Sequence, residues 1–363
     1  MKILYGVVGE GMGHAMRSMV LLEHLTARGH ELRIVASGRA ATVLAKAYPE
    51  QVTEITGLTM VYEDNEVRKW KTALQNLKAA IGIPENLRAH LEMAATFSPD
   101  VVISDFESWT YTFARSQHIP VISVDNMQII HRAEHEPDLI GDDKAAFLLA
   151  KSIVRAKLPR ANQYLITTFF FPKLRKDRTS LHPPILRRVI LDAKAKVRAG
   201  DHVLVYQSGT SHGSLEEALS KVDAPFRIYG LRRDVSAPVT EGNLTFCPFS
   251  EAGFIDDMAS ARAVIAGGGF TTMGEAIFLG KPMLSVPLGG QFEQTLNANY
   301  LAKLGYGEKA EHIEAELVQS FLDKTPWYSE HLAGFAHDHN EGLFERLEAA
   351  MADAVREGPL EGI

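Results

Sequence analysis

The fold of this chain is decided by residues 263–305, which read AVIAGGGFTTMGEAIFLGKPMLSVPLGGQFEQTLNANYLAKLG. Residues 263–266 form an apolar run of the kind found in buried parallel strands, and three glycines follow directly. Thr271 and Thr272 come next, where a helix would begin. Glycines let a ligand approach the backbone, and the free amides and dipole at a helix start favour a phosphate. The stretch therefore predicts a strand, a phosphate-holding turn and a helix; a simple tight turn is the alternative.

Polar groups further along this stretch suit a ligand that carries hydroxyls. Glu275 falls in the first turns of the predicted helix, where its carboxylate can accept both hydroxyls of a ribose. Residues 287–294 follow the next strand and form a polar loop with paired glycines. Together with the glycine turn, these features favour a ligand that has both phosphate and hydroxyl groups.

Both halves of the chain alternate apolar strands with helices, which is typical of doubly wound α/β domains. In the second half, strands are predicted at 202–208, 226–230, 244–249, 263–266 and 282–287. In the first half, they are predicted at 2–8, 31–37, 101–104, 120–124 and 164–171, with helices at 14–28 and 39–48. We therefore predict an α/β protein with two Rossmann-like domains that face each other across a cleft.

The domain boundaries follow from length and proline content. A chain of 363 residues suits two domains of roughly 150 residues each. Pro183, Pro184 and a basic cluster indicate a linker region. The predicted units are an N-terminal domain (1–172), the linker region (173–200), a C-terminal domain (201–335) and a C-terminal helix able to pack back on the N-terminal domain (336–363).

Composition excludes several classes of protein. The formal charge of −7 argues against non-specific binding of nucleic acid. The single cysteine, Cys247, cannot form an intrachain disulfide and fits a reducing compartment, so we expect a cytoplasmic protein. No uncharged apolar run reaches the ~18 residues of a membrane span. Peripheral contact with the inner face of a membrane stays open.

The N-terminal loop reads Gly9-Glu10-Gly11-Met12-Gly13-His14 and follows the first predicted strand. This spacing differs from the dinucleotide pattern G-x-G-x-x-G, and no acidic residue ends the second strand, which weakens the case for a Rossmann oxidoreductase. His14 would start a helix at the carboxyl edge of the sheet, where ligands bind in such folds. It is our candidate general base, Glu10 is the rival, and Arg17 could contact a phosphate or pack along the helix.

A histidine base needs an orienting partner, and Asp105 is the best candidate. It follows the strand 101–104, also at a carboxyl edge, 91 residues after His14. It would hold the imidazole tautomer and stabilise the charged form. Capping of the helix that begins near Glu107 is the alternative.

The segment 263–305 resembles the donor-binding signature of GT-B-fold glycosyltransferases. It is similar to that of the UDP-glycosyltransferases of plants and antibiotic pathways and to that of the bacterial peptidoglycan GlcNAc-transferase family. The shared residues are Gly267–Gly269, Glu275, Gly280-Lys281-Pro282, Glu293-Gln294 and Asn297-Ala298. The plant-type enzymes often place a phosphate-contacting histidine where this chain has Gly267.

The resemblance implies a role for each matched residue. Glu275 would bind the ribose, and Glu293 and Gln294 would meet the sugar hydroxyls. The residues expected around the diphosphate are Gly268, Gly269, Phe270, Thr271 and Thr272, together with Gly11, Gly13 and Arg17 from the N-terminal loop. A second phosphate-facing turn is expected at Ser208, Gly209 and Thr210, and the backbone near Phe249 would hold the base. Plant-type enzymes also resemble this chain in having a histidine after the first strand and a downstream aspartate.

The resemblance implies an inverting hexosyltransferase with a nucleotide-sugar co-substrate, no cofactor and no bound metal. UDP is the expected nucleotide, and TDP is the alternative. The acidic pairs Asp142-Asp143 and Asp256-Asp257 are interpreted as exposed helix caps. The N-terminal domain would bind the acceptor, which could be a lipid, a glycan or a small natural product. A nucleotide-sugar 2-epimerase or hydrolase of the same fold and a non-catalytic sugar-nucleotide-binding protein remain alternatives.

Overall fold

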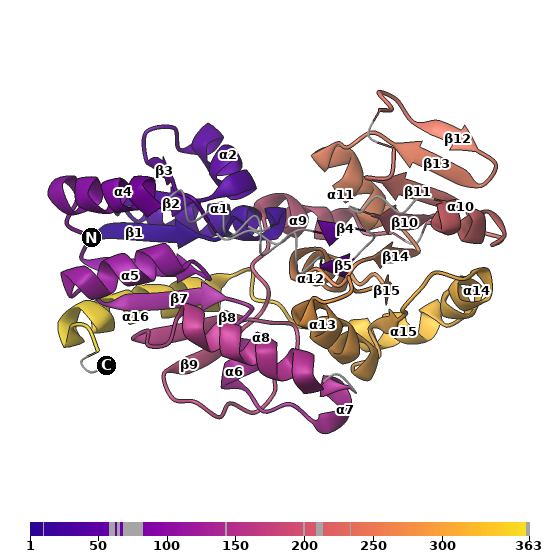
Figure 1. Ribbon diagram of the computed structural model, residues 1–363. Helices are drawn as coiled ribbons and strands as arrows, with labels where there is room; N and C mark the ends of the chain where they lie inside the picture. Colours follow the sequence, from indigo (N-terminus) through magenta and orange to yellow (C-terminus); the bar gives the residue numbers. More distant parts are fainter. Residues whose placement is uncertain are drawn as a thin grey trace.

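The computed structural model describes residues 1–9, 11–57, 62–63, 66–67, 83–141, 144–198, 200–207, 213–232 and 234–360. They form two lobes, each built on a seven-stranded sheet (Figure 1). The predicted α/β fold with two Rossmann-like domains is confirmed. The described residues include no helix that is both long enough and apolar enough to cross a membrane.

The N-terminal sheet is entirely parallel, in the order β3-β2-β1-β6-β7-β8-β9. Its strands are β1 (Lys2–Val7), β2 (Glu31–Ala36), β3 (Val52–Glu54), β6 (Val101–Asp105), β7 (Val121–Asp125), β8 (Gln163–Thr167) and β9 (Thr179–His182). Its helices are α1 (Met12–Ala27), α2 (Gly38–Ala47), α4 (Ile83–Thr96), α5 (Ser108–Gln117), α6 (Ile129–Arg132), α7 (Pro137–Ile140) and α8 (Lys144–Lys157). A separate antiparallel pair joins β4 (Tyr62–Glu63) and β5 (Glu66–Val67).

The C-terminal sheet has the order β12-β13-β11-β10-β14-β15-β16 and is parallel except at the edge strand β12. Its strands are β10 (Val203–Tyr206), β11 (Phe226–Tyr229), β12 (Val239–Glu241), β13 (Leu244–Cys247), β14 (Ala263–Ala266), β15 (Met283–Ser285) and β16 (Gly307–Lys309). Its helices are α10 (Gly213–Ser220), α11 (Glu251–Ser260), α12 (Phe270–Phe278), α13 (Phe292–Lys303), α14 (Ala315–Asp323) and α15 (Thr325–Leu332).

The stretch predicted to be a linker is partly regular structure. Residues 179–182 within it form β9, which pairs in parallel with β8, so the N-terminal sheet extends past residue 172. The preceding strand is shorter than the predicted 164–171 and ends at Thr167. The short helix α9 (Arg188–Ala193) and a 3-10 turn at Lys194–Lys196 then lead into the C-terminal lobe.

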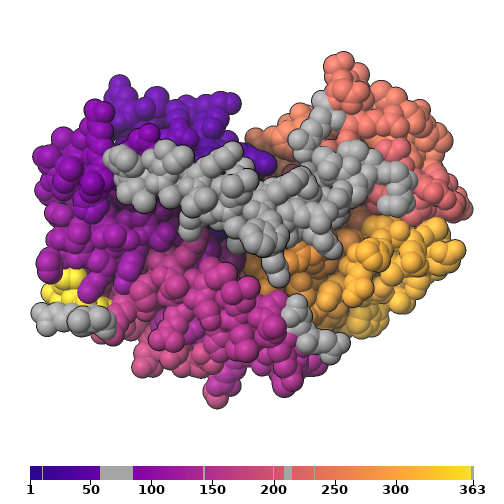
Figure 2. All heavy atoms as spheres, viewed as in Figure 1, coloured from indigo at the N-terminus to yellow at the C-terminus, as the bar shows by residue number. Residues whose placement is uncertain are grey.

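The chain crosses between the lobes twice. After α15 it returns to the N-terminal lobe as α16 (Glu341–Glu357), which contacts β6, β7 and β8 and is drawn in yellow in Figure 1. The two crossing segments are joined to each other, because the Asn340 side chain bonds both backbone groups of Leu186, at 2.9 and 2.8 Å. Figure 2 shows the indigo-to-magenta lobe and the orange lobe side by side.

Candidate active site

The starts of two helices from different lobes meet between the sheets. Helix α1 follows β1 and α12 follows β14, and the two helices are in contact. A Cβ atom added at Gly13 would lie only 2.6 Å from the Thr271 hydroxyl oxygen, so this approach requires glycine. The two glycine loops that the sequence singled out thus face each other, as expected where the carboxyl ends of two parallel sheets meet.

His14 and Asp105 lie side by side at this point. Strands β1 and β6 are neighbours, with Val7 opposite Asp105, and His14 stands at the start of α1. The His14 Nδ1 is 2.9 Å from the Asp105 Oδ1. Asp105 is fully buried, whereas the His14 side chain keeps 17% of its exposure. Nε2 of His14 has no hydrogen bond to the described residues, so it is the ring nitrogen left for a ligand.

Arg17 also binds Asp105, which the sequence analysis did not anticipate. Its Nε donates to Oδ2 over 2.8 Å, and its Nη2 donates to Oδ1. Its Nη1 donates to the side-chain oxygen of Asn126. Because the guanidinium is almost wholly buried and each of its nitrogens has a partner, it acts as the counter-ion of Asp105. Ser18 adds a further hydrogen bond to Oδ2 over 3.1 Å.

The pKa values of Asp105 and His14 are both lowered in this cluster. Burial raises the pKa of Asp105, but the Arg17 guanidinium and His14 outweigh it and hold that pKa well below its usual range. Burial, and after it the Arg17 charge, lowers the pKa of His14, while Asp105 opposes the shift. A neutral imidazole beside an ionised carboxylate is the form that a general base requires.

Asn126 extends the cluster across to the C-terminal lobe. It follows β7 directly, accepts from Arg17, and donates to the Glu293 Oε1 over 2.8 Å. The same carboxylate oxygen accepts from Asn297 over 2.6 Å, and Asn297 also donates to the Gly268 carbonyl over 3.1 Å. Burial raises the pKa of Glu293 to about 7, although Asn297, Arg17 and Asn126 oppose the shift. The sequence analysis missed Asn126; its position directly after a buried strand was the available signal.

Glu275, the predicted ribose-binding residue, is buried on α12 beside Arg187. Both Nε and Nη2 of Arg187 donate to its Oε1, over 3.0 and 2.7 Å. Burial raises the pKa of Glu275 above its usual value, and the Arg187 charge opposes that shift. Arg187 was not among the predicted site residues.

Gln294 lies against the glycine turn, not free in the cleft. Its Oε1 accepts from the backbone amides of Gly268 and Leu288, over 3.2 and 3.0 Å. The Gly268 amide therefore donates to Gln294 in this structure. The backbone around Gly269 has open space where a Cβ would stand, and the ring of Phe270 stacks on Phe169 at 6.2 Å.

The remaining predicted residues are scattered or undescribed. Gly11 is the N-cap of α1 with φ of 80°, a conformation that favours glycine. Thr272 is half-buried on α12, and Phe249 is 72% exposed before α11. The following residues lie outside the described part of the chain: Glu10, Asp142, Asp143, Ser208, Gly209 and Thr210.

One acidic pair was interpreted wrongly. Asp257 is buried on α11, where it accepts from the Tyr229 hydroxyl over 2.7 Å and pairs with Arg227, so it is not an exposed cap. Within the described residues, no group of three His, Cys, Asp or Glu side chains is arranged to hold a metal.

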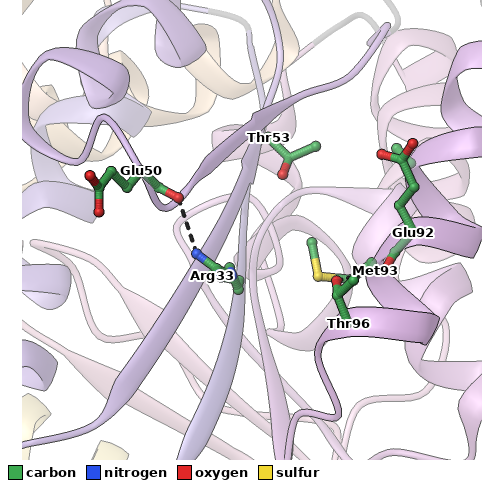
Figure 3. Close-up of a pocket in the computed structure, with 7 residues that line it drawn as sticks. Arg33, Glu50, Thr53, Glu92, Met93 and Thr96 are labelled. Atoms are coloured by element: carbon green, nitrogen blue, oxygen red, sulfur yellow. Dashed lines mark hydrogen bonds between the residues drawn. The ribbon is translucent and has the colours of Figure 1, made fainter.

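A pocket on the N-terminal lobe lies apart from these residues (Figure 3). It is formed by β2, β3 and α4, and in it the Arg33 Nη1 donates to the Glu50 carbonyl over 3.0 Å. Its lining residues are Arg33, Glu50, Thr53, Ala89, Glu92, Met93 and Thr96. None of them is a predicted site residue.

Comparisons with known proteins agree on one class. The sequence model described as glycosyl transferase family 1 matches residues 1–326. A Methanosarcina acetivorans protein named "Uncharacterized glycosyltransferase" is 26% identical over 339 residues, covering 86% of this chain and 84% of the relative.

Two solved structures have a similar fold. One is Phytolacca americana UGT2 complexed with UDP-2fluoro-glucose and pterostilbene, at a TM-score of 0.68 and 14% identity, covering 97% of this chain and 98% of the other. The second is MurG of Acinetobacter baumannii, at a TM-score of 0.58 and 16% identity, covering 96% and 99%. The expected GT-B architecture, and the resemblance to both of these groups, are confirmed.

Proposed function

Because the chain belongs to glycosyl transferase family 1 and is a glycosyltransferase, we propose that it is an inverting enzyme with a UDP-sugar donor and His14 as its general base. The observation that carries this proposal is the His14–Asp105 pair, held at the point where the glycine loops of the two lobes meet. The observed cluster offers a base on one side of the cleft and backbone amides on the other.

In the proposed reaction, Nε2 of His14 removes the proton from an acceptor hydroxyl. The acceptor oxygen forms a bond to the anomeric carbon as the bond from that carbon to the diphosphate oxygen breaks on the opposite face. The proton stays on the imidazole, whose positive charge Asp105 stabilises, and the diphosphate carries away the electron pair. The amides of Gly269, Phe270 and Thr271 at the start of α12 meet this developing charge.

The tautomer of His14 matters for this role. An ionised carboxylate accepts but cannot donate, so the 2.9 Å contact with Asp105 requires a proton on Nδ1. Arg17 Nη2, 2.7 Å from the same nitrogen, could only donate to a bare Nδ1. We take the first arrangement as the reactive one, because it leaves Nε2 with its lone pair.

The donor-binding roles belong to the same proposal. Glu275 would accept hydrogen bonds from the ribose hydroxyls, and Glu293 and Gln294 would accept them from the sugar hydroxyls. The backbone at Phe249 would contact the base. Ser208, Gly209 and Thr210 would add phosphate contacts, with no metal or cofactor required. Phytolacca americana UGT2 binds UDP-2fluoro-glucose, which supports UDP; TDP remains the alternative.

The base is tested by His14→Ala. We expect kcat with donor and acceptor to fall by about 10²- to 10⁴-fold while UDP affinity, measured by calorimetry, is unchanged. His312→Ala, at an exposed position of the other lobe, is the control. Turnover retained in His14→Ala but lost in Glu10→Gln would make Glu10 the base.

The alternatives have distinct outcomes in the same assay. Release of free sugar from the donor at an undiminished rate without acceptor would show a hydrolase, and a changed configuration at carbon 2 would show an epimerase. Tight UDP binding without turnover of any donor would show a sugar-nucleotide-binding protein.

Peripheral membrane contact is also part of the proposal, and one face of α8 supports it. Leu148, Leu149 and Ile153 are exposed on that helix, whereas Val154 is buried and Phe147 and Ala150 are partly buried against the core. Lys151 on the same helix lies close enough to Arg175 and Lys176 for their charges to lower its pKa, after burial. In a chain of net charge −7, this apolar and basic surface fits the anionic surface of a bilayer.

A further inference from the structure

Arg187 lies in a segment that crosses between the two lobes, and its side chain binds two carboxylates of the C-terminal lobe. It is the N-cap of α9, in the first crossing segment, and its side chain is only 17% exposed. Its Nη1 pairs with Glu251 at the start of α11, and its other two nitrogens bind Glu275. One guanidinium therefore joins the crossing segment to two helices of the C-terminal lobe.

Only one oxygen of the Glu275 carboxylate is bonded to Arg187. Arg187 Nε and Nη2 donate to the same oxygen, Oε1, over 3.0 and 2.7 Å. Oε2 accepts no hydrogen bond from the part of the chain that the structure describes. A carboxylate has room for about four hydrogen bonds. Arg187 thus fixes the orientation of the group and leaves one oxygen available.

The position of Arg187 is itself held firmly. Leu186, its neighbour, is bonded through both backbone groups to the Asn340 side chain. Pro184 lies against α12, where a Cβ added at Gly274 would come within 2.8 Å of its ring. The crossing segment is therefore packed directly on the helix that carries Glu275, and the planar guanidinium keeps the carboxylate in one orientation.

We propose that Arg187 is a positioning residue for the nucleotide ribose: it binds Oε1 of Glu275 so that Oε2 accepts from the ribose hydroxyls. The inference rests on the proposed function, in which Glu275 binds the ribose. It adds a residue that the family signature in 263–305 does not contain. It predicts that a residue of the crossing segment affects the preference for nucleotides that carry ribose hydroxyls.

The test compares UDP with 2′,3′-dideoxy-UDP, which lacks both ribose hydroxyls. Dissociation constants are measured by calorimetry for the wild-type protein and for Arg187→Met. We expect the variant to bind UDP about tenfold or more weakly, because the ribose hydroxyls lose their hydrogen bond to the charged Glu275 carboxylate. The affinity for the dideoxy nucleotide should change little. The preference of the protein for UDP should therefore nearly disappear.

Two controls separate positioning from folding. Arg188→Met removes the adjacent arginine, whose side chain is 82% exposed and pairs with Asp192, and should change neither affinity. Glu251→Gln removes the charge of the other partner of Arg187 and should keep the preference for UDP. Glu275→Gln should weaken UDP binding as much as Arg187→Met does, and the double variant should weaken it no further.

The outcomes distinguish this inference from the proposed function. An equal loss of affinity for both nucleotides in Arg187→Met would make the Arg187–Glu275 pair structural and overturn the inference. Wild-type protein that turns over a UDP-sugar but does not prefer UDP over the dideoxy form would overturn it too, while leaving the proposed function standing. Absence of binding to either nucleotide would remove the proposed donor and the inference with it.

Discussion

At the residue scale, His14 must be neutral to accept a proton. Burial and the Arg17 charge lower its pKa from the usual value of about 6.5, while Asp105 opposes the shift. We therefore expect kcat/KM to rise with pH along a limb below pH ~6.5 and then to level off. Asp105→Asn removes the opposing charge, so the limb should move to lower pH and kcat should fall by about 10²- to 10⁴-fold. The position of the limb is measured by a pH profile of kcat/KM, and the fall in kcat by the rate at saturating substrate.

The control for this variant is Ser18→Ala. It removes a different hydrogen bond to Asp105, of 3.1 Å, and leaves every charge in place, so its limb should coincide with that of the wild type. Asp105→Asn also leaves the buried Arg17 without its counter-ion, so its unfolding must be followed in parallel. An unmoved limb in a folded Asp105→Asn protein would contradict the proposed role.

The contrast between Asp105 and Arg17 shows which residues could be predicted. His14 and Asp105 follow strands that pair in register, and the carboxyl ends of paired parallel strands always meet. The partners of Arg17 could not be predicted because they depend on side-chain packing: Asp105 neutralises it, and Asn126, which follows a third strand, accepts from its Nη1. The contact of Gln294 with the Gly268 amide could not be predicted either, since only the folded loop brings the two together.

At the scale of elements, the end of β7 is linked to the start of α13 through Asn126 and Glu293. The pKa of Glu293 is raised to about 7, so the folded protein favours the protonated carboxyl group at low pH. The stability that this group contributes is lost as the pH rises through 7. Asn126→Asp still accepts from Arg17 but sets a second carboxylate against Glu293. We expect a loss of about 1–3 kcal/mol in unfolding free energy at pH 8, and less at pH 5.

A second substitution should reverse this loss. When Asn126→Asp is combined with Glu293→Gln, the glutamine amide can donate to the introduced carboxylate, so stability at pH 8 should return toward that of the wild type. Asn299→Asp is the matched control: its amide also crosses between the lobes, to the Leu139 carbonyl over 2.8 Å, but it does not touch Glu293. If Glu293→Gln rescued both variants equally, the specific link between β7 and α13 would be refuted.

The element pattern itself was readable from the sequence where strands are buried on both faces. The central strands β1, β6, β10 and β14 consist mostly of apolar residues, which is how parallel strands covered by helices appear. The missed strands are two to four residues long and lie at sheet edges: β3, β4, β5, β9, β12 and β16. Too short to show a period, they are defined only by the neighbour with which they pair.

At the scale of the whole molecule, α8 connects the proposed membrane face to the cleft. Its inward residue Phe147 packs against Phe292 of α13, at 5.3 Å between ring centres, directly before Glu293. His135, after α6, bonds the Tyr300 hydroxyl on the same helix over 2.9 Å. These contacts show that the stretch after β7 lies in the contact between the lobes. A bilayer bound to the outer face of α8 would therefore lie beside the contact between the lobes.

This arrangement predicts binding to anionic vesicles. We expect the protein to sediment with vesicles of phosphatidylcholine and phosphatidylglycerol at 7:3, and not with phosphatidylcholine alone. Leu148→Gln with Leu149→Gln should weaken binding about tenfold or more, because two leucines no longer enter the bilayer. Arg175→Glu with Lys176→Glu should weaken it similarly and reduce its dependence on salt.

The matched control is Leu87→Gln with Leu91→Gln on α4, where both leucines are as exposed as those of α8. If this control lost vesicle binding as fully as the α8 variant, general surface hydrophobicity would be the cause and α8 would not be the docking face. Binding to neutral vesicles as strong as to anionic ones would contradict the role of Arg175 and Lys176. Because none of these side chains touches the His14–Asp105 cluster, turnover of a water-soluble acceptor should be unchanged in every variant, which separates membrane docking from catalysis.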